Sequence, residues 1–426
     1  MVSLKILKLS AKLTLIILIL INLKIFFSFE KKVYIQDKKI IRTLSESNCN
    51  VFRENYEPYK IEIDGSIYPK SVPLLLNKTI NFECLQNTSI IKKILVWTPF
   101  FGTWRYGYGL GSETPFIVQK CPVTKCMITN DKSQINSSDL VLIHMRDNIE
   151  EAPIFRPKNQ KWIFTLFESP INSPNYSNYN FFFNLTSTYR IDSEFSSFYE
   201  VGSRIEWALN KSFNENNDYH AEKSGFATAL ISNCGSDTSK RLDYIKELQN
   251  HISVDLYGNC GKKCPDKHKN LQSAECKEIL GKEYKFYLAF ENSYCKDYIT
   301  EKFFVILKYN IIPVVLGGGQ YDHFIPKSGF INVKDFNSPK HLAEYLMYLD
   351  RNKTAYNSYF KWKKHVNFLK ELPDFSPICN MCIYLHLERL TGVSRKILGD
   401  IDEYWYRDSC KLPRLNDEKN FEINSS

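Results

Sequence analysis

The chain has 426 residues, of which 43% are hydrophobic and 24% charged; this allows two domains and excludes an intrinsically disordered protein. Its formal net charge is +9, and the basic residues are spread along the chain rather than gathered in one stretch. An anionic ligand or solvated lysines account for this charge as well as nucleic acid does, so we expect no nucleic-acid partner.

Residues 13–29 form an almost uninterrupted apolar run, and three lysines precede it. The run is slightly shorter than the roughly 20 residues of a typical spanning helix. Positive charge before a span favours a cytosolic N-terminus. A cleaved signal peptide is the alternative, but no small-x-small cleavage site is evident. We therefore predict a cytosolic tail (1–12), one signal anchor in the lipid bilayer (13–29) and a lumenal remainder.

Twelve cysteines, an even number, suit an oxidising compartment. Cys379 and Cys382 lack the second CxxC or paired histidines of a zinc site, so we predict disulfides, such as one joining these two residues. Sequence alone does not fix the connectivity.

Eight N-x-S/T sequons are candidate glycosylation sites. They begin at Asn77, Asn87, Asn136, Asn175, Asn184, Asn210, Asn352 and Asn424.

Residues 30–90 are polar and irregular, and predict a stem. A first domain follows at 91–215, up to a polar break within 203–224. Short runs rich in β-branched and aromatic residues predict its buried strands. These strands are expected at 94–98, 139–145, 161–167 and 183–190.

The second domain, residues 216–372, alternates strands and helices. This alternation predicts an α/β fold with a doubly wound parallel sheet and helices on both faces. A C-terminal extension covers residues 373–426. The predicted strands are 226–232, 252–258, 285–290, 311–316 and 330–333, and the predicted helices are 236–250, 299–309, 338–350 and 353–371.

Such sheets bind ligands beyond the carboxyl ends of their strands, where residues 232–234, 291–293 and 317–319 fall. Glu301 and Lys302 open the helix that projects toward the same edge. A lysine at a helix N-terminus suits a phosphate, and a carboxylate suits ribose hydroxyls. The pair therefore suggests a ligand with both sugar and diphosphate. The alternative is a glutamate that serves the helix dipole beside a solvated lysine.

Arg241, at the start of the preceding helix, has the planar fork that grips a diphosphate, although a surface arginine on an amphipathic helix is the ordinary interpretation. There is no GxxxxGK[ST] loop, and no GxGxxG follows a strand in the required way. Phosphate binding by either of those loops is not expected.

Several motifs occur together in order: HMRD (144–147), FESP (167–170), FNLTSTYRIDSEF (183–195), SNC (232–234), VDLYGNCG (254–261), FYLAFENSYCKDYITEKFF (286–304) and IPVVLGG (312–318). Together they closely resemble the α1,3-fucosyltransferase family over about residues 92–365. The long block at 286–304 is the most specific of them.

The resemblance implies a GT-B glycosyltransferase, with two Rossmann-like domains facing a cleft. It implies inverting transfer of L-fucose from GDP-fucose to the 3-hydroxyl of GlcNAc on glycoprotein glycans, in lactosamine-type antennae or in an N-glycan core. It also implies a Golgi membrane enzyme that requires no metal, with Mn or Mg at most stimulatory.

The resemblance also assigns roles to residues. Glu168 matches the general base, and its place after an apolar strand predicts partial burial, which would raise its pKa toward working pH. Related enzymes usually read PYG near 196–202, where this chain has SSFYEVG and Tyr199 is only a weak substitute. The other assignments are diphosphate contacts for Arg241 and Lys302, further donor contacts for Ser232, Asn233, Asn292, Tyr298 and Glu301, and acceptor or linkage roles for His144 and Arg146.

Two alternatives remain. One is a catalytically inactive homologue that binds sugar, although Glu168, Arg241 and Lys302 are all present. The other is a metal-dependent transferase of another fold. That class needs a DxD after a strand, and the chain offers only DID at 400–402.

Overall fold

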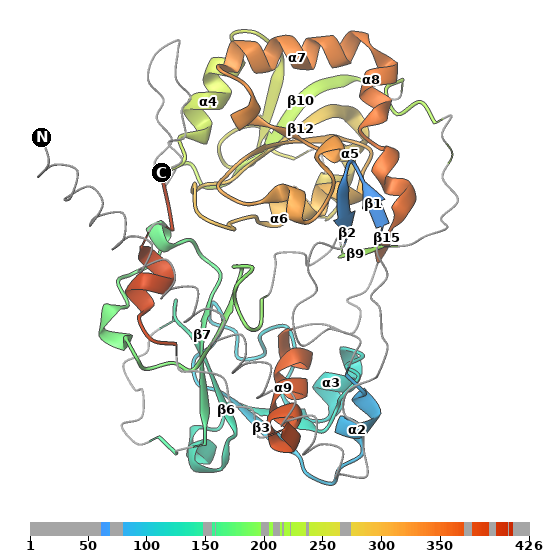
Figure 1. Ribbon diagram of the computed structural model, residues 1–426. Helices are drawn as coiled ribbons and strands as arrows, with labels where there is room; N and C mark the ends of the chain where they lie inside the picture. The colour runs from blue at the N-terminus through green and yellow to red at the C-terminus, as the bar shows by residue number, and fades with distance from the viewer. Residues whose placement is uncertain are drawn as a thin grey trace, which may run out of the picture.

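The structure is a computed structural model. The described residues form two α/β halves, which lie one above the other in Figure 1. The described residues are 61–68, 80–147, 156–157, 159–196, 204–207, 214, 217–221, 223–235, 238–264, 274–369, 377–391, 398–407 and 409–411. The predicted anchor at 13–29, Asn77, Tyr199, Asn210 and Asn424 lie outside them. Across the described ranges, no helix is both long and apolar enough to cross a membrane.

The first half is built on a six-stranded sheet with the order β4-β5-β3-β6-β7-β8, parallel except for β4. The runs LVLIH in β6 and KWIFTL in β7 are buried throughout, as expected for strands of a parallel sheet covered on both faces. The strands are β3 (Lys92–Val96), β4 (Gly111–Ser112), β5 (Cys126–Thr129), β6 (Leu140–His144), β7 (Lys161–Leu166) and β8 (Leu185–Thr188). The four strands predicted here are confirmed, three with shorter bounds and β3 shifted by two residues toward the N-terminus, whereas β4 and β5 were missed.

The second half has a five-stranded parallel sheet with the order β11-β10-β12-β13-β14. Its strands are β10 (Gly225–Leu230), β11 (Val254–Tyr257), β12 (Tyr284–Phe290), β13 (Ile312–Leu316) and β14 (Ile331–Asn332). All five strands predicted here are confirmed. The strand order reverses beside β10, which makes the carboxyl ends of β10 and β12 a place where such sheets bind ligands.

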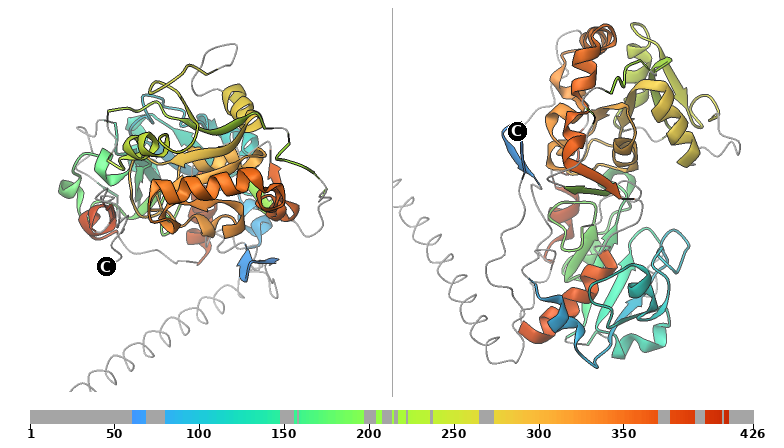
Figure 2. Two further views of the ribbon diagram at one scale, coloured as in Figure 1. Left: turned by 90° about the horizontal axis from the view of Figure 1, so that it is seen from above. Right: turned by 90° about the vertical axis from the view of Figure 1, so that its right-hand side faces the viewer.

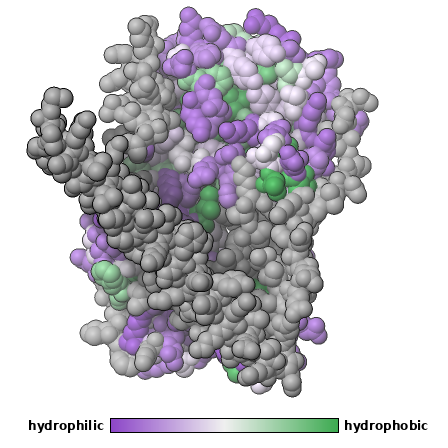
Figure 3. Space-filling model, viewed as in Figure 1, coloured by the Kyte–Doolittle hydropathy of each residue, from purple (hydrophilic) through white to green (hydrophobic). Residues whose placement is uncertain are grey.

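Helices cover both faces of this second sheet, as predicted. Alternate residues of β12 face opposite sides: Phe286 packs with one helix layer and Tyr287 with the other. The helices α4 (Arg241–Leu248) and α7 (Pro339–Arg351) form the first layer, and α5 (Ala274–Glu283) and α6 (Glu301–Phe304) form the second (Figure 1). On the face seen in Figure 3, hydrophilic side chains predominate over this half.

Helix α7 shows how the sequence sets such an element. Ser338 caps it by accepting a hydrogen bond from the backbone N–H of His341, and Pro339 occupies the first turn, where proline removes no intrahelical bond. Leu342, Leu346 and Leu349 are buried at a spacing of three or four residues. The prediction for 338–350 is therefore confirmed.

The helix predicted for 353–371 is wrong beyond its first turns. Helix α8 covers only Lys353–Ser358, and the chain then forms a strand, β15 (Val366–Leu369). That strand pairs antiparallel with β9 (Arg204–Trp207), inside the stretch predicted to be a polar break. Long-range pairing has overridden the local pattern, which carried no sign of the distant partner strand.

The predicted stem also contains structure. Within residues 30–90, a hairpin forms from β1 (Ile61–Ile63) and β2 (Ser66–Tyr68), and helix α2 covers Phe82–Gln86. The Tyr68 ring stacks on Trp207 with a centroid separation of 4.8 Å. The stem expectation therefore does not hold for these segments, since side chains from them are buried against the body.

The C-terminal extension returns to the first half (Figures 1 and 2). Helix α9 (Pro377–Thr391) packs in the same core as α2 and α3 (Thr114–Val118). Cys379 bonds to Cys121 and Cys382 bonds to Cys126, so both candidates are disulfide-bonded but their predicted mutual pairing is wrong. The reason is the docking of α9 on the first half. It brings Cys379 to the loop before β5, where Cys121 lies, and Cys382 to Cys126 in β5 itself.

The sequons differ in accessibility. Asn87, Asn136 and Asn175 are exposed. Asn184 is half-buried, and its side-chain oxygen accepts a hydrogen bond from the backbone N–H of Trp162 at 2.9 Å. Asn352 caps α8 through the backbone N–H of Ala355. The exposed three are the better placed to carry a glycan.

Candidate active site

A cavity of about 510 Å³ lies between the two halves, where the carboxyl ends of strands from both sheets face each other. Its walls include the ends of β6, β7, β10 and β12 and the start of α6. Apart from His144, every residue predicted for catalysis or for donor or acceptor binding lines it. The lining residues are Arg146, Glu168, Asn172, Leu230, Ser232, Asn233, Arg241, Lys277, Tyr287, Asn292, Tyr298, Thr300, Glu301 and Lys302.

Glu168 is the carboxylate that the first half contributes to the cavity. It comes two residues after the end of β7 and is half-buried, so the predicted partial burial is confirmed. Among the described residues, no side chain forms a hydrogen bond or an ion pair with its carboxylate. The group is therefore available to accept a proton from a ligand in the cavity.

Lys302 is the ammonium group on the opposite wall. Its Nζ lies 2.9 Å from Oγ1 of Thr300, 3.3 Å from Oε2 of Glu291 and 3.4 Å from Oε1 of Glu301. Burial by itself would lower the pKa of Lys302, but the carboxylates of Glu291 and Glu301 outweigh it and raise that pKa. Lys302 is therefore charged at neutral pH.

The pKa of Glu301 is shifted in the opposite direction to that of Lys302. Burial would raise the pKa of its carboxyl group, but the ammonium of Lys302 outweighs burial and holds that pKa below its usual value. Thr300 caps the helix by accepting from the backbone N–H of Lys302. Helix α6 is only four residues long, however, so the side-chain charges outweigh the helix dipole here.

Arg241 lies at the base of the second-half wall and is only 1% exposed. Its Nη1 donates to the carbonyl of Phe290 at 3.1 Å, and its Nη2 donates to the carbonyl of Asn233 at 3.0 Å. A disulfide between Cys234 and Cys260 further fixes the loop that carries Asn233. The arginine is therefore built into the site and is not the surface arginine of the alternative interpretation.

Asn292 and Tyr298 are held by the polypeptide around them. The carbonyl of Asn292 accepts from the backbone N–H of Ser239 at 3.2 Å. Tyr298 is nearly buried and packs edge-on against Tyr189, with ring centroids 4.9 Å apart. Tyr189 belongs to the first half, so this ring contact also joins the two halves at the cavity.

The HMRD motif divides between the cavity and the core. Arg146 lines the cavity, whereas His144 is completely buried and does not. His144 Nδ1 lies 2.5 Å from Oδ2 of Asp147, and that carboxylate accepts from the backbone N–H groups of Phe101 and Gly102. Burial lowers the pKa of His144 despite this partner. The structure therefore links His144 to the loop at 100–103 rather than to the cavity wall.

Residues 100–104 carry three aromatic side chains, two of them exposed. Phe101 is 53% exposed and has φ of 46°, a strained conformation for a bulky residue, and Trp104 is 37% exposed. The ring of Phe100 contacts Phe167, which directly precedes Glu168. The contact with Phe167 places this segment beside the end of the strand that precedes Glu168.

Sequence reasoning missed three groups of the site. Lys277 lies on α5, which was not predicted, and burial lowers its pKa. Glu291 was quoted within a motif but received no role, although it is fully buried against Lys302. Asn172 follows FESP and had no signal of its own. The gap between the predicted strands at 252–258 and 285–290 could have suggested α5.

Two candidate metal sites lie elsewhere. Cys126, Cys382 and His386 are within ligand distance of one another, but the two sulfurs form a disulfide and are not available as thiolates. In DID, Asp402 accepts hydrogen bonds from Ser177 and Asn180. Neither group lines the cavity, so this DxD is not placed to hold a diphosphate there.

Two family models match the chain. One, described as glycosyltransferase family 10 (fucosyltransferase) C-term, matches residues 220–404, and the other, described as fucosyltransferase, N-terminal, matches residues 90–200.

Curated relatives match over most of the chain. Glycoprotein 3-alpha-L-fucosyltransferase A of Drosophila melanogaster is 36% identical over 331 residues, which cover 76% of this chain and 62% of the fly protein. The human 4-galactosyl-N-acetylglucosaminide 3-alpha-L-fucosyltransferase 9 is 34% identical over 327 residues, covering 74% of this chain and 82% of that protein. This chain thus spans less than two thirds of the fly relative's length. A solved structure, alpha1,3-fucosyltransferase with GDP-fucose, covers 73% of this chain and 94% of its own, with 18% identity and a TM-score of 0.46.

Proposed function

We propose a function that starts from the family: this chain belongs to glycosyltransferase family 10, the fucosyltransferases. In this proposal it transfers L-fucose from GDP-fucose to the 3-hydroxyl of GlcNAc in glycoprotein glycans. The observation that carries the proposal is the composition of the cavity. One carboxylate without an ion-pair partner among the described residues, Glu168, faces Arg241, Lys277 and Lys302 across it. A base opposite a group of cations suits attack by a hydroxyl on a sugar diphosphate.

In this mechanism Glu168 accepts the proton of the acceptor hydroxyl as its oxygen attacks C1 of fucose. The bond between C1 and the diphosphate oxygen breaks, the electron pair leaves with GDP, and the configuration at C1 inverts. The sugar passes through an oxocarbenium-like state, as in glycoside hydrolysis. A carboxylate on one wall and the leaving group on the other match a displacement from opposite faces.

The donor occupies the second half. Arg241 and Lys302 bind the diphosphate and offset the charge that develops on it. Glu301 accepts hydrogen bonds from sugar hydroxyls, and Ser232, Asn233, Asn292 and Tyr298 complete the donor contacts. Because these cations supply the positive charge, the reaction requires no metal, and Mn or Mg is at most stimulatory.

The acceptor glycan approaches from the first half, where Arg146 selects the 1,3 linkage. The exposed rings of Phe101 and Trp104 offer apolar faces on which a sugar ring can stack. The names of the two relatives above cover a glycoprotein 3-fucosyltransferase and a 4-galactosyl-GlcNAc 3-fucosyltransferase. A lactosamine-type antenna and an N-glycan core are thus the two acceptor classes to compare.

In the proposed organisation the chain is a GT-B enzyme, with an acceptor-side half and a donor-side half facing the cleft. Residues 13–29 anchor it as a single-pass type II protein in the Golgi membrane, with the catalytic part in the lumen. The apolar run, the preceding lysines and the fully disulfide-bonded described cysteines support this placement.

The test is a transfer assay with the full-length protein in detergent. GDP-fucose is offered with lactosamine, core N-glycan and chitobiose-type acceptors, with and without EDTA. We expect transfer to the 3-hydroxyl of GlcNAc that persists in EDTA. The acceptor to which transfer is fastest identifies the class of glycan that the enzyme uses. Binding of GDP without transfer to any acceptor would favour an inactive homologue, and loss of transfer in EDTA would favour a metal-dependent mechanism.

A further inference from the structure

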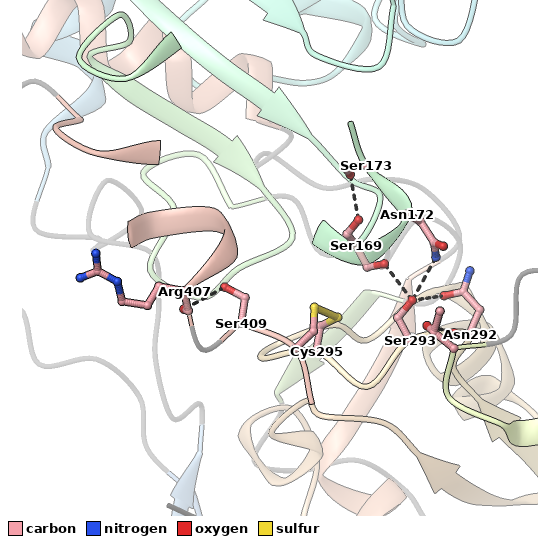
Figure 4. Close-up of a disulfide and its surroundings, with 10 residues drawn as sticks. Ser169, Asn172, Ser173, Asn292, Ser293, Cys295, Arg407 and Ser409 are labelled. Atoms are coloured by element: carbon pink, nitrogen blue, oxygen red, sulfur yellow. Dashed lines mark hydrogen bonds between the residues drawn. A yellow bond between two sulfur atoms is a disulfide. The ribbon is translucent and has the colours of Figure 1, made fainter. Parts of the chain in front are cut away.

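The hydroxyl of Ser293 forms a junction between the two halves beside the cavity (Figure 4). Ser293 is completely buried. Its Oγ lies 2.8 Å from Oγ of Ser169, 3.0 Å from Nδ2 of Asn172 and 3.2 Å from Oδ1 of Asn292. Ser169 and Asn172 belong to the first half, and Asn292 belongs to the second.

These three contacts use the full capacity of one hydroxyl, which can donate once and accept twice. Ser293 donates to Oδ1 of Asn292 and accepts from Nδ2 of Asn172, so the remaining contact is donated by the hydroxyl of Ser169. Because Oδ1 of Asn292 is engaged in this way, the amide of Asn292 is fixed with its Nδ2 available to a ligand in the cavity.

Each partner of Ser293 is joined to a different group of the site. Ser169 directly follows Glu168, the proposed base. The carbonyl of Asn172 accepts a hydrogen bond from Nη1 of Arg146, on the acceptor side. Asn292 is itself a donor-side residue of the cavity wall. One buried hydroxyl therefore connects the base, the acceptor side and the donor side.

The loop that carries Ser293 is itself fixed, so the junction has a rigid base. Cys295, two residues further on, bonds to Cys410 in the C-terminal segment. The backbone N–H of Lys296 donates to the carbonyl of Ser409 at 2.6 Å, and the backbone N–H of Lys411 donates to the carbonyl of Tyr294 at 2.9 Å. The loop that carries Ser293 is thereby tied to the C-terminal segment, which packs on the first half.

We propose that Ser293 is a positioning residue. It holds the loop that carries Glu168 at the distance and orientation that the bound donor requires. This inference rests on the proposed function, because the position of the Glu168 loop matters only if Glu168 acts as a base in a reaction at the donor carbon. Misplacement of reacting groups by about 1 Å can lower a rate by about 100-fold. Loss of the hydroxyl would also leave the half-buried amide groups of Asn172 and Asn292 without this partner.

The test compares Ser293→Ala with Ser173→Ala in the full-length protein. Ser173 is a matched control, since its hydroxyl donates to the carbonyl of Ser169 at 2.8 Å within the same loop and does not reach across to the second half. The measurements are kcat, KM for acceptor, the Kd for GDP and the thermal midpoint, with Ser293→Thr as the rescue variant.

We expect Ser293→Ala to lower kcat by about 10-fold or more, with GDP still bound with near-native affinity by Arg241 and Lys302. We expect Ser173→Ala to keep kcat near native and Ser293→Thr to restore most of the loss. Equal kcat in both alanine variants, or a loss confined to GDP affinity or to thermal stability, would overturn the positioning role alone. Absence of transfer by the native protein, with every acceptor, would overturn the proposed function and this role with it.

Discussion

Glu291 and Lys302 form an ion pair at the cavity wall, with Oε2 and Nζ 3.3 Å apart. The carboxylate of Glu291 is fully buried and also accepts from the backbone N–H of Thr300 at 2.8 Å. Burial raises the pKa of Glu291, and the ammonium of Lys302 works against that rise. The pair places a positive charge at the proposed donor site, and the carboxylate of Glu291 itself does not line the cavity.

Replacing this carboxylate should shift the pH dependence of donor binding. In Glu291→Gln, Lys302 loses a carboxylate that raises its pKa, so it should begin to lose its proton at a lower pH than in the native protein. GDP affinity measured between pH 7 and 10 should therefore weaken earlier in this variant. Glu278→Gln, an exposed change on α5, is the control; superimposable pH profiles for all three proteins would contradict the account.

Lys302 and its second carboxylate partner, Glu301, set a window of stability. The pKa of Lys302 is raised above its usual 10.5, so its contribution to folding stability is present below about pH 10.5 and is lost as pH rises through the folded value. The pKa of Glu301 is lowered from 4.5, so its contribution is present above about pH 4.5 and is lost as pH falls through the folded value. Both charges are therefore intact at neutral pH.

Lys277 should contribute to donor affinity. Beside Arg241 and Lys302, it is the third cation that the second half contributes to the cavity wall, and Lys277→Met removes its charge while keeping an unbranched side chain of similar length. We expect KM for GDP-fucose to rise several-fold, and its increase with salt to become shallower, since fewer charges attract the diphosphate. Lys282→Met, on the exposed face of the same helix, should leave both quantities unchanged. An equal effect of the two changes would remove Lys277 from the site.

His386 should make folding stability fall on mild acidification. Its Nε2 donates to the carbonyl of Lys125 at 2.8 Å, and burial lowers its pKa below the usual 6.5. The unfolded chain then binds the proton more readily, so stability is retained above about pH 6.5 and lost as pH falls toward the folded value. Urea unfolding at pH 7 and pH 5.5 should show a smaller loss in His386→Gln than in native protein. The exposed His251→Gln is the control, and an unchanged loss in His386→Gln would contradict the prediction.

The disulfide between Cys126 and Cys382 should strengthen the docking of α9. Because the neighbouring Cys121–Cys379 bond already closes a loop of almost the same length, removal of this one bond should cost up to about 2 kcal/mol of unfolding free energy. Chemical unfolding of Cys382→Ser measures this loss. Peptide mapping of non-reduced protein should join 121 to 379 and 126 to 382, and a peptide with Cys379 bonded to Cys382 would disprove the arrangement.

Much of the site was predictable because its residues follow buried strands. Parallel strands read as short apolar runs, and their carboxyl ends must meet at one edge. That reasoning located Ser232, Asn292 and the start of α6, and the family resemblance supplied the opposing Glu168. The structure brings these groups to one cavity.

What escaped prediction depends on contacts between distant segments. The strand at 366–369 exists because β9 lies beside it, about 160 residues earlier, and local pattern favoured a helix there. The return of α9 to the first half decides which cysteines meet, and spacing within CNMC carried no trace of it. The Ser293 junction likewise joins side chains 124 and 121 residues apart, so only the folded chain reveals it.

The most direct test of the central claim is single-turnover fucose transfer by Glu168→Gln, beside the Kd for GDP of the same variant. Glutamine keeps the shape of the side chain but cannot accept the proton. We predict that transfer falls by about 100-fold to 10,000-fold while GDP affinity stays near native. Near-native transfer with intact GDP binding would contradict the assignment of Glu168 as the base. Loss of GDP binding in this variant would place the residue in donor binding instead.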